Sequence, residues 1–72
     1  MTNLEWILSI HRMVKFWSTE RKAVATNTEI RRWFDRGSIE IDGVPAKAAD
    51  ERAFPVKSLV LFPKGNRRIT II

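Results

Sequence analysis

The chain has 72 residues, of which 44% are hydrophobic, and its formal net charge at pH 7 is +5. This length fits one small domain that can bury a core, so we expect a single domain over residues 1–72. Cysteine is absent, which excludes disulfides and thiolate metal sites. The apolar residues between 4 and 17 are interrupted by Glu5, Arg12 and Lys15, which argues against a membrane span or a signal peptide. We therefore expect a cytoplasmic protein that does not associate with membranes.

The excess positive charge is concentrated in two stretches. Residues 21–37 hold five basic and two acidic side chains, and residues 59–72 hold three basic side chains and no acidic one. Such clustering is typical of proteins that bind a polyanion, and nucleic acid is the first candidate. The alternative is that the charge only keeps a small domain in solution.

A first helix is predicted over residues 3–17, with Thr2 or Asn3 as its N-cap. One broad arc of its helical wheel is apolar and is predicted to face the core: Trp6, Ile7, Ile10, Met13, Val14 and Trp17. Phe16 points away from this arc, which suggests a partner contact, a stacking platform or packing on the following loop. His11, the only histidine, is expected at the surface or its boundary.

The densest local signals lie in residues 26–43 (TNTEIRRWFDRGSIEIDG). Thr26 and Glu29 form a capping-box pattern, in which each side chain accepts a backbone N–H bond from the other residue. They predict a helix over residues 27–36 whose apolar stripe consists of Ile30, Trp33 and Phe34. The next residues predict a helix stop, a half-buried strand over 38–42 and a tight turn, carried by Gly37, Ile39, Ile41 and Asp42-Gly43.

The remaining segments complete an α+β pattern. Residues 18–25 are predicted to extend the first helix by a turn or to form a loop, and residues 44–47 to form an edge strand because Pro45 cannot donate to a ladder. Residues 48–53 are predicted as a loop, 58–62 as a buried strand, 63–66 as a turn and 67–72 as a returning strand. We expect the helices to pack on one face of a small antiparallel sheet.

Residues 26–34 (TNTEIRRWF), followed by Gly37, Ile39, Ile41 and Asp42-Gly43, resemble the core signature of the S4 RNA-binding domain family. The resemblance implies an αL-like fold of two or three short helices on a small, curved antiparallel sheet. It also implies binding of structured RNA, such as ribosomal or tRNA-like RNA, through the second helix and the adjoining loop. The chain departs from the family pattern at Lys57-Ser58, where a Gly-Asp pair is usual, and at its Asn3-Leu4-Glu5 opening.

The second helix and the loop before it supply the candidate RNA contacts: Lys22, Asn27, Thr28, Arg31, Arg32 and Arg36. Arginine forks match phosphate oxygens, and the amide and hydroxyl groups can bind phosphate or a 2′-OH. The alternative is that Arg32 and Arg36 only form surface ion pairs with Asp35, Glu29 and Glu40. A possible second basic site consists of Lys64, Arg67 and Arg68.

Catalysis has little support in the sequence, and we expect no enzyme activity, metal or cofactor. His11 has no cysteine to pair with, and Asp42, Asp50 and Glu51 do not have the spacing of a metal site. The second functional hypothesis is docking on an acidic protein surface, suggested by Lys57-Ser58, Phe16 and the apolar C-terminal residues. We expect a monomer, with a homodimer through the terminal strand as the alternative.

Overall fold

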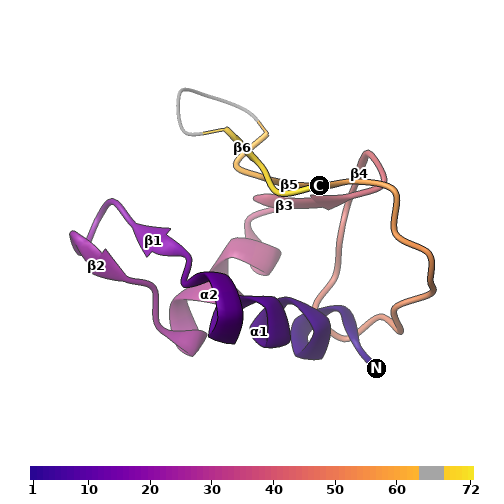
Figure 1. The fold of residues 1–72 in the computed structure, drawn as a ribbon, viewed down its shortest axis with the longest axis horizontal. Helices are drawn as coiled ribbons and strands as arrows, with labels where there is room; N and C mark the ends of the chain where they lie inside the picture. The colour runs from indigo at the N-terminus through magenta and orange to yellow at the C-terminus, as the bar shows by residue number, and fades with distance from the viewer. Residues whose placement is uncertain (64–67) are drawn as a thin grey trace.

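The structure is a computed structural model that describes residues 1–63 and 68–72. It confirms the predicted α+β fold. Two helices lie on the same side of a four-stranded antiparallel sheet, and a two-stranded hairpin extends from the helical layer (Figure 1). The described elements are α1 (Asn3–Val14), β1 (Trp17–Ser18), β2 (Ala23–Val24), α2 (Asn27–Asp35), β3 (Ile39–Ile41), β4 (Val44–Pro45), β5 (Leu59–Leu61) and β6 (Ile69–Thr70). Within the described residues, neither helix is long and apolar enough to cross a membrane.

Helix α1 begins at a complete capping box. The Thr2 hydroxyl accepts the Glu5 N–H at 3.1 Å, and the Glu5 carboxylate accepts the Thr2 N–H at 2.8 Å. That hydrogen bond from the Thr2 N–H holds the pKa of Glu5 below its ordinary value, because it favours the charged carboxylate. The helix ends three residues earlier than predicted, since Lys15 adopts a left-handed conformation (φ 61°) and donates its N–H to His11 O.

The buried face of α1 differs from the predicted apolar arc. Its stripe of buried residues, spaced four apart, is Asn3, Ile7 and His11, with Trp6 beside it. Two of these side chains are polar, and they are buried because they hydrogen-bond backbone groups of neighbouring segments. The Asn3 side-chain amide donates to Lys47 O at 2.9 Å. A hydrophobic pattern alone could not identify this face.

The sequence prediction for His11 was therefore wrong: the imidazole is only 8% exposed. Its Nδ1 atom accepts the Phe16 N–H at 2.9 Å, so the ring proton lies on Nε2 and is donated to Ala25 O at 2.9 Å. His11 thus ties the end of α1 to both ends of the segment that follows it.

That segment, predicted as a helical extension or a loop, is a hairpin. Strands β1 and β2 pair antiparallel, with Trp17 opposite Val24 and Ser18 opposite Ala23. Because the left-handed Lys15 ends the helix, Phe16 and Trp17 do not follow the helical periodicity that the sequence predicted. Phe16 is 5% exposed and packs against His11 and Trp33, whereas Trp17 is 55% exposed. The prediction of Trp17 in the core was wrong, and Met13 (86% exposed) and Val14 also lie outside the core. Of the three roles predicted for Phe16, burial contradicts the partner contact and the stacking platform.

Helix α2 forms nearly where the sequence predicted it. The Thr26 hydroxyl accepts the Glu29 N–H at 3.1 Å, but the Glu29 carboxylate accepts a hydrogen bond from the Ser18 hydroxyl of β1. Only one half of the predicted capping box is present, because the other half has been replaced by this bond to the hairpin. The bond fixes the hairpin against the start of α2.

The four-stranded sheet has the order β4-β3-β5-β6, with β4 at an edge as Pro45 predicted. Asp42 and Gly43 (φ 53° and 82°) make the tight turn between β3 and β4. The Asp42 carboxylate also accepts the N–H groups of Lys57 (2.7 Å) and Ser58 (2.9 Å), and these hydrogen bonds, that of Ser58 first, lower the pKa of Asp42. These hydrogen bonds fix the Lys57-Ser58 segment through its backbone N–H groups. They do not depend on the side chains at these two positions, so a Gly-Asp pair is not required for them.

The core lies between the helices and the sheet. Its predicted members are confirmed: Ile30, Trp33, Phe34, Ile39 and Ile41 pack with α1 and with the fully buried strand β5. The predicted strand at the C-terminus is present as β6, paired to β5. The predicted turn at residues 63–66 falls largely outside the described residues.

Candidate nucleic-acid interface

The exposed side of α2 carries its polar and basic residues in two adjacent rows. Residues four apart lie on the same face of a helix, which places Thr28, Arg32 and Arg36 in one row and Asn27 and Arg31 in the next. All five side chains are exposed. The opposite side of the helix is buried in the core, so the basic side faces solvent as the amphipathic pattern predicted.

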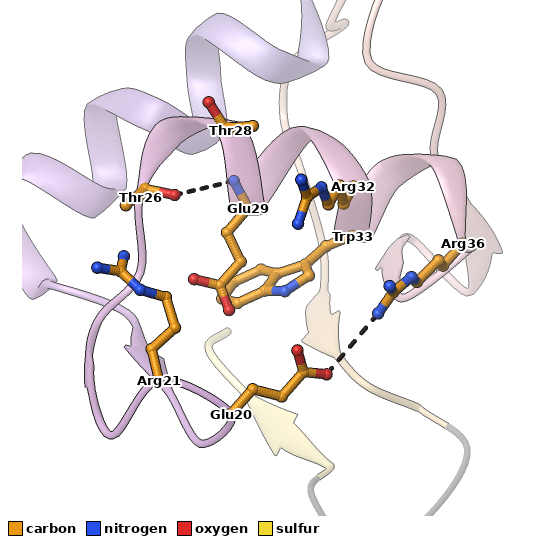
Figure 2. A pocket seen from close by; sticks show the side chains of 8 residues that line it. All are labelled: Glu20, Arg21, Thr26, Thr28, Glu29, Arg32, Trp33 and Arg36. Atoms are coloured by element: carbon orange, nitrogen blue, oxygen red, sulfur yellow. Dashed lines mark hydrogen bonds and ion pairs between the residues drawn. The ribbon is translucent and has the colours of Figure 1, made fainter.

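The first row borders a cleft between α2 and the tip of the β1–β2 hairpin. The cleft has a volume of about 260 Å³ and is lined by Glu20, Arg21, Thr26, Thr28, Glu29, Arg32, Trp33 and Arg36. Figure 2 shows Arg21 and Glu20 on the hairpin side, facing the row formed by Thr28, Arg32 and Arg36. Three guanidinium groups thus surround a cleft that holds two carboxylates.

The ion pairs of this surface differ from the predicted alternative. Arg36 lies 3.8 Å from the Glu20 carboxylate, and both side chains are well exposed. A pair of this kind contributes less than about 1 kcal/mol, so it does not commit Arg36 to a structural role. Arg21, Arg31 and Arg32 form no ion pair within the described residues, and the expected pairs with Asp35, Glu29 and Glu40 are not formed there.

The start of α2 adds hydrogen-bond donors to the cationic surface. The N–H groups of Asn27 and Thr28 have no acceptor among the residues that the structure describes, as is usual in the first turn of a helix. Unpaired N–H groups and the helix dipole favour an anion at this position. The arrangement can therefore bind phosphate oxygens through guanidinium forks and backbone amides together.

The acidic side chains of this surface do not gather into a metal-binding group within the described residues. In the part of the chain that the structure describes, no cluster of three histidine, cysteine or acidic side chains could hold a metal ion. Glu29, which lines the cleft, accepts the Ser18 hydroxyl at Oε2, and its Oε1 atom is buried without a hydrogen-bond partner within the described residues.

Most of the candidate contact residues are brought together. Thr28, Arg32 and Arg36 line the cleft, Asn27 and Arg31 lie beside it, and Lys22 sits in the hairpin turn with a positive φ of 54°. The site prediction omitted Arg21 and Thr26, and Arg21 could be placed only after residues 17–24 were recognised as a hairpin. Of the possible second basic site, Arg68 is exposed just before β6, and Lys64 and Arg67 lie outside the described residues.

Comparison with protein-family models, with curated proteins and with solved structures found no match.

Proposed function

We propose that the protein is an RNA-binding module that contacts the backbone of structured RNA through the basic side of α2 and the hairpin before it. The observation that carries the proposal is the cleft beside α2, which Arg21, Arg32 and Arg36 line, together with the N–H groups of Asn27 and Thr28 at the start of that helix, which have no acceptor among the described residues. Three arginines of this surface, Arg21, Arg31 and Arg32, have no competing ion pair within the described chain. The resemblance of residues 26–43 to the S4 signature supports the same ligand class, and we propose that the domain is S4-like.

The mechanism is backbone recognition by charge-assisted hydrogen bonds. Arg21 of the hairpin and Arg32 of α2 line the same cleft, so guanidinium forks from both elements can bind phosphates of one backbone. Asn27 and Thr28 supply side-chain groups that can hydrogen-bond phosphate or a 2′-OH. Such contacts fix the position of the RNA, and they make the affinity depend strongly on salt because counterions are released.

The experiment measures the affinity for a labelled stem-loop RNA by fluorescence anisotropy over a range of salt concentrations. Replacing Arg31 and Arg32 by alanine should weaken binding at least about tenfold, the loss expected from two charge-assisted contacts. The slope of log K against log salt should fall by about 1.4 or more, since each lost phosphate contact contributes roughly 0.7 to 0.9. The midpoint of thermal unfolding should change little, because both side chains are exposed.

The matched control removes the same charge elsewhere. Lys47 and Lys57 are exposed on the loops that follow β4 and precede β5, so their double alanine variant should keep most of the affinity. Equal losses in the two double variants would mean that only net charge matters, which contradicts a specific interface.

The alternative of docking on an acidic protein surface is weakened by one observation. Its proposed apolar anchor, Phe16, is buried against His11 and Trp33 and is not available to a partner. Pull-down from lysate with and without nuclease separates the two functions, since RNA-mediated partners are lost on nuclease treatment and a direct protein partner persists.

A further inference from the structure

The exposed tryptophan of the hairpin has no role in the core. Trp17 is 55% exposed, whereas Trp6 and Trp33 are buried. Within the described residues, the aromatic contacts join Phe16 to His11 and Trp33, Trp33 to Phe62, and Trp6 to Phe54, and Trp17 is not part of them. Exposing a large aromatic ring has no benefit for folding, so a ligand is the better explanation of its position.

The position of Trp17 is fixed by the opposite face of the same hairpin. Ser18 is 2% exposed and its hydroxyl bonds to Glu29 of α2, while Ala25 N donates to Phe16 O at 2.8 Å. Because successive residues of a strand point to opposite faces, Trp17 and its partner Val24 lie together on the outer face. The β1–β2 hairpin lies at the edge of the helical layer (Figure 1). Its anchored inner face fixes the backbone that carries Trp17.

The charge near Trp17 in the chain indicates the kind of ligand. Arg12 and Lys15 precede it, and Arg21 and Lys22 occupy the hairpin turn that follows it. All four side chains are exposed and none forms an ion pair within the described residues, whereas the one acid of the turn, Glu20, is paired to Arg36. An indole surrounded by cations can bind a nucleotide, because the base can stack on the indole and the phosphate can pair with a cation.

We propose that Trp17 is a stacking platform for an unpaired base of the bound RNA. This inference rests on the proposed function and narrows its ligand to RNA that has unpaired nucleotides next to the part held by α2. The turn that carries Arg21 and Lys22 lies between the cleft and the outer face of the hairpin. Arg21 lines the cleft, and Trp17 lies on the outer face. A strand that leaves the cleft along this turn keeps its phosphates on the two cations and brings a base to the indole.

The test compares two labelled RNAs that share one stem: a stem-loop with an unpaired loop and a fully paired duplex. Trp17→Ala should weaken binding of the stem-loop at least about fivefold, the lower range for loss of one stacked base, and leave duplex binding unchanged. Trp17→Phe should retain most of the affinity, because a phenyl ring also stacks. Val24→Ala, on the same outer face, is the control for a general effect of the hairpin, and urea unfolding checks that all variants fold equally well.

Each outcome separates this inference from the proposed function. Wild-type protein that binds neither RNA in a salt-dependent way refutes both. Wild-type protein that binds RNA, with Trp17→Ala equal to wild type or equally weakened on both RNAs, overturns the stacking role alone. The role is also overturned if Trp17→Ala abolishes binding to anionic phosphatidylserine vesicles, or self-association in light scattering, while RNA binding is unchanged.

Discussion

Replacement of His11 by phenylalanine tests the most unexpected structural element, the buried polar link between α1 and the hairpin. The change keeps an aromatic ring at a position that is 8% exposed and removes both hydrogen bonds of the imidazole. The Phe16 N–H and the Ala25 carbonyl are then left without their partner, at a cost of about 1–3 kcal/mol each. Burial of a more apolar ring offsets on the order of 1–2 kcal/mol, so the midpoints of these ranges predict a net loss of about 2–3 kcal/mol.

Urea unfolding followed by circular dichroism measures this loss. For a small domain whose total stability is on the order of 5–10 kcal/mol, the expected change is large. Arg12→Ala, on the exposed side of the same helix, should stay within about 0.5 kcal/mol of wild type. Hydrogen exchange should also accelerate at the Phe16 amide. A His11→Phe variant that is as stable as wild type, with that amide still protected, would refute the assigned hydrogen bonds.

Three further predictions concern the caps, the turn and the core. Thr26→Ala should destabilise the protein by about 1 kcal/mol in urea unfolding, because Glu29 N–H loses its acceptor, and Thr26→Ser should restore the loss. Asp42→Asn keeps the positive φ of the turn but lacks a titrating carboxylate. The pKa of Asp42 in the folded protein lies below its ordinary value of 3.8. The free energy of unfolding should therefore be larger for wild type than for this variant at neutral pH, and the difference should disappear as the pH falls below 3.8. A difference in stability that persists in acid contradicts the hydrogen bonds to Ser58 and Lys57. Leu59→Ala should cost about 2–5 kcal/mol because Leu59 is fully buried, whereas Val44→Ala at the exposed edge should cost under about 0.5 kcal/mol.

The segments that the sequence predicted well are those whose signals are local. The Thr26 cap, the stripe from Ile30 to Phe34 and the Asp42-Gly43 turn each act over a few residues, and all are present in the structure. The dense apolar run of β5 was also sufficient to predict a buried strand, because a short, continuous apolar segment is typical of a strand that is buried on both faces. The exposed arginines of α2 follow directly from the buried side of the same helix.

The segments that the sequence did not predict depend on contacts between distant residues. His11 is buried because Ala25 and Phe16 offer it backbone partners, and nothing in the α1 sequence reveals them. A left-handed helix end is usually marked by glycine, but here the residue is Lys15, which the sequence gives no reason to select. Its conformation ends α1 and determines that Phe16, and not Trp17, enters the core. The cleft could not be predicted for the same reason, because it requires the hairpin to be placed against α2 by the Ser18–Glu29 bond.

RNA bound as proposed contacts the basic side of α2 and the hairpin turn. Titration of isotope-labelled protein with the stem-loop RNA, followed by amide chemical shifts, tests this placement most directly. The largest shift changes should fall on residues 20–36, with Arg21, Asn27 and Thr28 among them. Changes confined to the β4 edge and the loop at residues 46–53, or no changes at low salt, would contradict it.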